Sequence, residues 1–163
     1  MDEYRNLIDG QLRAGGSGTF DNVNPATEEV FSQAPDASEQ DMADAIASAR
    51  RAFDDTDWSR DGAFRKHCLY QLKDAIEVEK EDLRALLISE VGCPVLTTFG
   101  PQLDAPLREA LTWPADMIEK FPWSRSLGPI DSFGVGYQTD REVWKEPIGV
   151  VGVIVPWNFP IEI

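Results

Sequence analysis

Residues 149–163 read GVVGVIVPWNFPIEI, and this stretch decides the fold. Its first seven residues carry no charge and no hydrogen-bonding side chain, and Pro156 ends the run. β-Branched residues bounded by Gly and Pro favour a strand, and a strand that is apolar on both faces belongs inside a covered, usually parallel, sheet. Parallel neighbours need crossover connections of about a dozen residues or more. Because the sequence ends at Ile163, we expect the chain to be the front part of a larger α/β protein.

Composition narrows the class of protein. The 163 residues provide for one domain, and 29 acidic against 15 basic residues give a net charge of −14. Such a surface repels nucleic-acid phosphates and anionic membranes, so we reject both as partners. The first ten residues lack the apolar core of a signal peptide, and no apolar run approaches the ~20 residues of a membrane span. We expect a cytoplasmic protein with reduced cysteines.

The region before residue 38 has the pattern of short strands and turns. Residues 7–12 predict a strand interrupted by an Asp-Gly turn. An extended segment over 20–23 leads to a turn at Asn24-Pro25, and a further short strand is centred on Val30. A helix is predicted over 38–54, because Ser38 and Asp41 resemble a capping box and apolar residues then recur at helical spacing.

Further helices follow. One is predicted from about residue 60 to 79, and another over 81–90, with Gly92 in the C′ position. Residues 101–121 are again predicted to be helical, with Pro106 or Pro114 ending or kinking a segment.

An extended arm is predicted between about residues 130 and 147, after an irregular stretch over 122–129. Its large or β-branched side chains fall on alternate positions, which is the strand period, with turn residues among them. These positions are Phe133, Val135, Tyr137, Thr139, Arg141 and Val143.

Several candidate motifs carry no chemistry. Gly134 and Gly136 lack the third glycine and the following helix of a phosphate-binding loop. Cys68 and Cys93 follow no nucleophile motif and are interpreted as buried or incidental thiols. His67 is the only histidine and has no partner at zinc-ligand spacing, so no metal site is expected.

The loop Pro156–Pro160 is the one segment that suggests a functional site. It follows the predicted buried strand, at the end where open α/β sheets place their ligands. Two prolines fix its backbone, and Asn158 lies between Trp157 and Phe159. A side-chain amide held rigidly there could donate hydrogen bonds to a developing oxyanion. The alternative is an Asn that satisfies its own turn.

The residues also resemble a known family. Residues 146–160, EPIGVVGVIVPWNFP, are similar to a signature of the NAD(P)-dependent aldehyde dehydrogenases. The likeness continues upstream in LIDG at 7–10, in NPAT at 24–27 and in the predicted helix within 41–58. It covers essentially the whole chain.

The resemblance implies a reaction and the residues that take part in it. In the family a cysteine thiolate attacks an aldehyde, a glutamate activates water and a carboxylic acid is released. Asn158 would hold the oxyanion together with the backbone N–H of that cysteine. The cysteine and the glutamate lie downstream of this stretch, so the isolated chain is expected to be inactive. The cofactor is NAD or NADP, and the residues implied to line its pocket are Ile154, Val155, Pro156 and Trp157.

The resemblance also implies an organisation. Residues 1–129 correspond to the N-terminal part of the cofactor-binding domain and 130–147 to an oligomerisation arm. Residues 148–163 correspond to the first strand and loop of the dinucleotide-binding sheet. The expected partners are a small aldehyde substrate and, at full length, further copies of the protein. A different possibility is a non-catalytic short form that pairs with a full-length partner.

Overall fold

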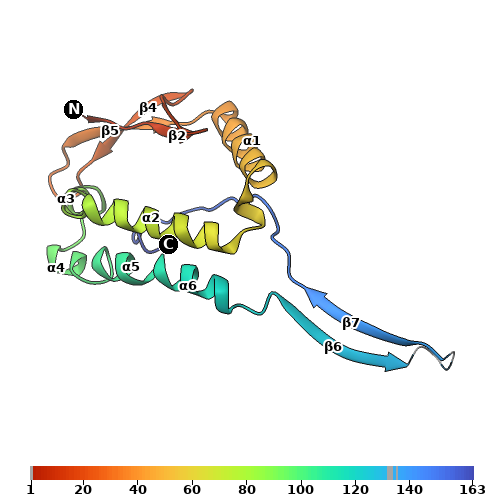
Figure 1. The fold of residues 1–163 in the computed structure, drawn as a ribbon. Helices are drawn as coiled ribbons and strands as arrows, with labels where there is room; N and C mark the ends of the chain where they lie inside the picture. The colour runs from red at the N-terminus through yellow and green to blue at the C-terminus, as the bar shows by residue number, and fades with distance from the viewer. Residues whose placement is uncertain (1, 132–133, 135) are drawn as a thin grey trace.

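A computed structural model describes residues 2–131, 134 and 136–163, and its strands and helices form two parts joined by one helix (Figure 1). The first part is made of short strands. A three-stranded sheet has the order β1-β5-β4, with β1 parallel to β5, and β2 pairs with β3 in a separate hairpin. The strands are β1 (Asp2–Glu3), β2 (Asn6–Ile8), β3 (Gln11–Arg13), β4 (Gly18–Val23) and β5 (Val30–Asp36).

The predicted Asp-Gly turn is confirmed between β2 and β3. Asp9 and Gly10 both have positive φ, at 55° and 71°. Two successive left-handed residues are what a two-residue hairpin turn needs to match the twist of its strands. The Asn24 turn is also present, since the carbonyl of Asn24 accepts from the N–H of Glu28 at 2.8 Å.

Helices make up the second part. In Figure 1, α1 connects the strands to a layer in which α2 lies alongside α5 and α6. Tyr70 and Lys66 of α2 tie this layer together, donating to Asp116 at 2.9 Å and to Glu119 at 2.8 Å respectively. The helices are α1 (Glu39–Asp55), the 3₁₀ turn η1 (Asp57–Ser59), α2 (Gly62–Val78), α3 (Lys80–Val91), α4 (Val95–Thr98), α5 (Asp104–Glu109) and α6 (Thr112–Lys120).

The predicted helix ends are confirmed where local chemistry sets them. Ser38 caps α1 with the reciprocal hydrogen bonds of a capping box to Asp41, and Gly92 ends α3 with a φ of 68°. The predicted helix over 101–121 is divided at residues 110–111, and Pro114 lies in the first turn of α6, where its ring excludes a continuous helix through the carbonyl of Ala110. The expectation for Pro106 was wrong: it lies in the first turn of α5, where its missing N–H costs no helical bond.

The arm is confirmed as a hairpin and is longer than predicted. Its strands are β6 (Ser124–Asp131) and β7 (Gln138–Trp144), and Figure 1 shows the pair extending away from the helices. The irregular stretch predicted over 122–129 is therefore wrong in most of its length. Gly128, with a φ of 74°, lies beside a register shift, so the chain stays in the ladder despite its Gly and Pro residues. Phe133 and Val135 lie outside the described residues.

The strand predicted over 149–155 is absent. Residues 145–156 carry no strand, and none of the backbone hydrogen bonds between described residues involves 146–157. The apolar pattern is that of a strand, but a strand forms only beside a hydrogen-bonded neighbour, and the described residues offer none. The cofactor sheet expected to begin in this segment is thus not formed here.

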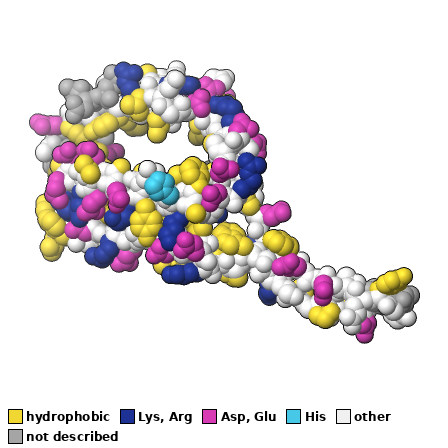
Figure 2. Space-filling view, viewed as in Figure 1, with side chains coloured by type: hydrophobic (Ala, Val, Ile, Leu, Met, Phe, Trp, Pro, Cys, Tyr) yellow, Lys and Arg dark blue, Asp and Glu magenta, His cyan; other side chains and the backbone are white. Residues whose placement is uncertain are grey.

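The main apolar core fixes the C-terminal end of the chain. It is formed by Leu87, Cys93, Leu103 and Leu107, and Ile161 packs against it. The C-terminus consequently returns to the helical layer, where Figure 1 marks it beside α2. Figure 2 shows that side chains leave the space between the strands and the helices hollow.

Candidate functional site

The candidate site is the loop Pro156–Pro160, which the structure attaches to the helical layer. The carbonyl of Asn158 accepts a hydrogen bond from Nε2 of Gln102 at 2.9 Å. The N–H of Ile163 donates to the carbonyl of Phe159 at 3.3 Å and closes a turn. The main chain of the loop is thus fixed at the carbonyls of Asn158 and Phe159.

The side chain of Asn158 is free. The residue is exposed, and none of the hydrogen bonds found among the described residues involves its side-chain amide. The alternative interpretation, an Asn that satisfies its own turn, has no such bond to support it. Both amide N–H groups are therefore available to a ligand.

The residues predicted to line a cofactor pocket lie on one exposed segment. Ile154 and Trp157 are 96% and 82% exposed, Val155 is also exposed and Pro156 is half-buried. The four residues are consecutive in the chain, but no described element packs over Ile154 to close a pocket. Cofactor sites are concave and mostly apolar, so the apolar character of these residues suits such a site, whereas the described residues do not enclose one.

Gln102 is a residue that the sequence does not single out. Its side chain is 6% exposed, and its backbone N–H donates to the carbonyl of Thr97 at 3.0 Å. It precedes Leu103, which is completely buried in the core. Its partner Asn158 lies 56 positions away in the sequence, so no local sequence pattern predicts this contact.

Arg84 of α3 organises the segment around Gln102. Its guanidinium donates to Thr98 at 2.9 Å and to Asp104 at 2.8 Å, and it lies over the ring of Phe99 at 4.2 Å. Hydrogen bonds to Glu81 and then Asp104 raise the pKa of Arg84, so this group keeps its charge. Burial opposes ionisation of Asp104, but its bonds to Arg84 and Lys80 outweigh burial and lower the pKa of that carboxyl.

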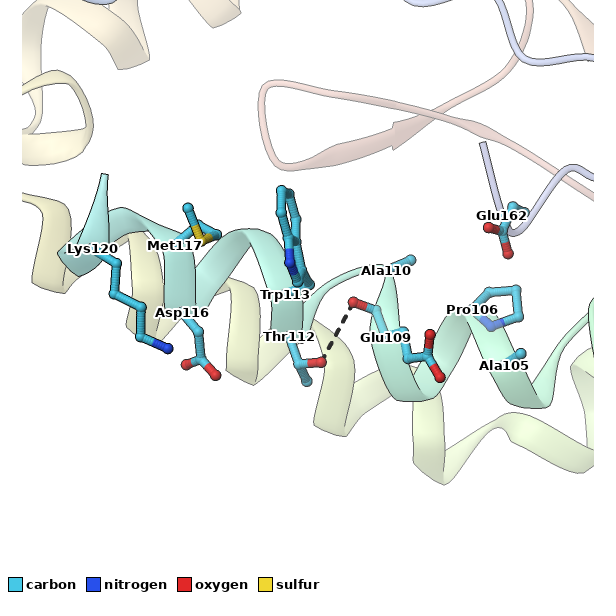
Figure 3. Close-up of a pocket in the computed structure, with 10 residues that line it drawn as sticks. All are labelled: Ala105, Pro106, Glu109, Ala110, Thr112, Trp113, Asp116, Met117, Lys120 and Glu162. Atoms are coloured by element: carbon cyan, nitrogen blue, oxygen red, sulfur yellow. Dashed lines mark hydrogen bonds between the residues drawn. The ribbon is translucent and has the colours of Figure 1, made fainter. Parts of the chain in front are cut away.

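A pocket of about 590 Å³ lies beside the helices that face the loop (Figure 3). Trp113 and Met117 rise from one face of α6, while Asp116 and Lys120 point to the other side. Glu162, to which the sequence assigns no role, lies across from Pro106. The pocket contains no thiol or histidine among its described lining residues.

The other candidate groups remain structural. Cys93 is buried in the apolar core, with its thiol 3.7 Å from the carbonyl of Leu87, and Cys68 is half-buried and unpaired. A thiol in apolar surroundings is inert as a nucleophile. His67 is exposed on α2, and no group of His, Cys, Asp and Glu within the described ranges could hold a metal ion. None of the described helices is both long and apolar enough to cross a membrane.

Sequence comparison places the chain among known proteins. The model described as the aldehyde dehydrogenase family matches residues 12–163. Aminoacetaldehyde dehydrogenase of Pseudomonas aeruginosa is 37% identical over 159 residues, which are 96% of this chain and 30% of that protein. The mitochondrial aldehyde dehydrogenase of Rattus norvegicus is 34% identical over 145 residues, covering 88% of this chain and 26% of the relative.

Structural comparison agrees. An NAD-dependent aldehyde dehydrogenase from Sinorhizobium meliloti has a TM-score of 0.82 and 32% identity, covering 99% of this chain and 31% of that one. A Mycobacterium tuberculosis aldehyde dehydrogenase complexed with NAD+ has a TM-score of 0.81 and 28% identity, covering 98% and 32%. The chain thus spans about three tenths of the length of the proteins it matches.

Proposed function

The chain belongs to the aldehyde dehydrogenase family, and on that premise we propose that it is the N-terminal part of an enzyme that oxidises an aldehyde to a carboxylic acid with NAD or NADP. The observation that carries the proposal is the state of Asn158. Its main chain is held by Gln102, while its side-chain amide is exposed and has no partner among the described residues. A residue whose main chain is fixed and whose side-chain amide is unpaired is suited to donate a hydrogen bond to a transient negative charge.

The role of Asn158 follows from the charge that develops during attack on a carbonyl. When a thiolate forms a bond to the aldehyde carbon, the electron pair of the C=O bond moves to oxygen and leaves an oxyanion. The amide Nδ2 of Asn158 donates to that oxygen. Because the full negative charge exists only in the tetrahedral state, the bond strengthens there and lowers the barrier.

The attacking thiolate comes from outside the described chain. Cys93 is buried in the core, and Cys68 lies within α2 on the partly buried face. Neither belongs to the loop or to the segment that precedes it. The chain on this proposal supplies the oxyanion donor and part of the cofactor surface, and residues elsewhere in the enzyme supply the nucleophile and the general base.

Four residues are proposed to hold the cofactor: Ile154, Val155, Pro156 and Trp157. Their apolar side chains, exposed except for the half-buried Pro156, suit van der Waals contact with a ligand, and their backbone groups, which make no hydrogen bond with described residues, suit hydrogen bonding. NAD or NADP, when bound, supplies the hydride acceptor for the oxidation. The role of these residues is to bind and orient it beside the amide of Asn158.

The proposal is tested by comparing two proteins. The first is the product of the complete reading frame that contains this sequence, and the second is the 163-residue chain alone. Each is incubated with NAD or NADP and a panel of small aldehydes, and NADH or NADPH formation is followed by absorbance. We expect turnover by the first protein and none by the second.

Two results would contradict the proposal. One is a complete protein that forms no reduced cofactor with any aldehyde of the panel. The other is turnover by the 163-residue chain alone, which would place the nucleophile among residues to which we assign no such role. A reading frame that stops after Ile163 would favour the non-catalytic short form instead.

A further inference from the structure

The contact between Gln102 and Asn158 joins distant parts of the chain at the candidate site. The side chain of Gln102 is almost fully buried and comes from the turn that precedes α5. Its Nε2 lies 2.9 Å from the carbonyl oxygen of Asn158. Among the described residues, no other hydrogen bond connects the loop 156–160 to a part of the chain outside its own turn.

The orientation of the Gln102 amide is determined by this contact. Only its N–H side can face a carbonyl oxygen favourably, since the opposite orientation would bring two acceptors together. Its Oε1 consequently points into a buried position where it has no partner among the described residues. A buried acceptor without a partner lowers stability. The residue is therefore poorly explained by stability alone.

The base of Gln102 is held rigidly. The Thr97 carbonyl accepts from its backbone N–H, and Leu103 anchors the next position in the core. On either side, Thr98 and Asp104 are both bonded to the guanidinium of Arg84. A side chain that is buried on such a base has few alternative positions, so it can hold the group that it contacts in place.

We propose that Gln102 is a positioning residue for Asn158: its amide fixes the main chain of the loop so that the Asn158 side chain meets the oxyanion. This inference rests on the proposed function, because it assumes that Asn158 is the oxyanion donor. An oxyanion donor must lie within a few tenths of an ångström of its best distance. Losing the bond from Gln102 removes the one hydrogen bond between this loop and a distant part of the described chain, and leaves the loop's own turn and its side-chain packing.

The first test measures the loop directly in the complete enzyme, because we expect the 163-residue chain alone to aggregate. Hydrogen–deuterium exchange followed by mass spectrometry compares the wild type with Gln102→Leu, which keeps the bulk but cannot donate. We expect faster exchange in the peptide covering 157–163 and little change in peptides from α2. The matched control is Gln71→Leu, the same change at an exposed position of α2. Equal exchange of the loop in wild type and Gln102→Leu would overturn the positioning role.

The second test uses the complete enzyme and asks whether Gln102 acts through Asn158. Gln102→Leu should lower kcat by about tenfold to 100-fold, with the KM for cofactor within about twofold of wild type. Gln71→Leu should leave kcat unchanged. In a background that already carries Asn158→Ala, Gln102→Leu should have little further effect, since the group that it positions is gone. Fully additive losses would show a separate, structural role and refute the proposal.

A third variant, Gln102→Glu, adds a pH signature. At neutral pH a carboxylate can only accept, so we expect activity as low as that of Gln102→Leu. When protonated, the carboxyl regains a donor, so the ratio of its kcat to that of wild type should rise as pH falls. A flat ratio would contradict the need for a donor at this position. These outcomes are separable from failure of the proposed function, in which the wild-type enzyme would show no turnover or Asn158→Ala would be active.

Discussion

The role proposed for Asn158 imposes two requirements that usually oppose each other. A catalytic donor has to be rigid, and it also has to leave its hydrogen-bonding groups unused until the substrate arrives. The structure meets both by binding the main chain of Asn158, through Gln102, and leaving its side chain exposed. Rigidity is therefore provided by the residue's backbone rather than by its functional atoms.

Replacing Asn158 with Ala should separate catalysis from stability. In the complete enzyme we expect kcat to fall about 100- to 1,000-fold, because one oxyanion donor is lost. The melting temperature should change little, because the bond from Gln102 reaches the main chain, which Ala retains. Steady-state kinetics per active site and a melting curve on the same preparation check both statements.

Asn22→Ala, a half-buried Asn in β4, is the matched control and should leave turnover near wild type. A structural role for Asn158 predicts the reverse pattern, with a lower melting temperature and normal turnover in the molecules that stay folded. Turnover within about threefold of wild type, less than ~1 kcal/mol in the barrier, would remove Asn158 from the catalytic machinery.

At the scale of single elements, the start of α1 shows how a carboxylate joins two segments. One oxygen of Asp41 accepts from the backbone N–H of Ser38 and from that of Gly16, each at 2.8 Å. The bonds from the backbone of Ser38 and then Gly16 lower the pKa of the Asp41 carboxyl. Its charge thus holds the loop before β4 against the helix.

The stabilising effect of Asp41 should depend on pH. Because the folded pKa is lowered, its contribution is fully present above the unfolded value of about 3.9 and is lost as pH falls through the folded pKa. Asp41→Asn should therefore unfold at lower urea than wild type at pH 7, and the gap should narrow below about pH 4. Urea titrations of the complete protein at several pH values measure it.

Glu39→Gln removes another charge from the same first turn without removing any of these hydrogen bonds, so it serves as the control. It should show a smaller gap that depends less on pH. An Asp41→Asn gap that is constant from pH 7 to pH 3 would mean that the charge of Asp41 does not contribute.

Elements set by neighbouring residues could be predicted from the sequence. The capping box at Ser38, the Asp-Gly turn and the left-handed Gly92 each depend on a few adjacent residues, and all three are present. Pro106 was misjudged because the effect of a proline depends on its distance from the helix start, which the pattern does not reveal. Gln102 was missed for a different reason, since its partner lies far away in sequence.

The segment 149–155 shows the limit of pattern reading. Its composition is that of a covered strand, yet several of its residues are widely exposed. The hydrophobic pattern of a segment indicates which of its side chains need burial. Whether the segment forms a strand depends on the presence of a neighbouring strand with which it can pair. The site was predicted from the sequence because the resemblance marked Asn158, while its support from the helical layer emerges only in three dimensions.

At the scale of the whole molecule, the chain exposes many large apolar side chains. Val151 and Val153 are 65% and 69% exposed, and they lie in the segment 146–157, which makes no backbone hydrogen bond with any described residue. Exposed, unpaired and uncharged strand-like segments promote association. We expect the 163-residue chain alone to aggregate or to bind other proteins.

Placing Lys at both Val151 and Val153 should have opposite effects in two settings. In the chain alone, the charges should raise the soluble, monodisperse fraction measured by size-exclusion chromatography. In the complete enzyme, the same changes should abolish folding, because they place charges where a covered sheet is proposed. Val78→Lys, at the exposed end of α2, should change neither result appreciably. A complete enzyme that tolerates both lysines would contradict the buried-strand interpretation.

The segment 146–157 is held at both ends, by the bond from Lys145 to the carbonyl of Trp123 at 2.8 Å and by that from Gln102 to Asn158. A free chain must lose conformational entropy when its ends are brought to fixed positions, and here that loss has already occurred. A further strand would therefore pair with a segment whose two ends are already fixed, rather than with a free, flexible chain. Helical packing that forms early would then nucleate a parallel sheet, the kind of structure that ordinarily assembles slowly.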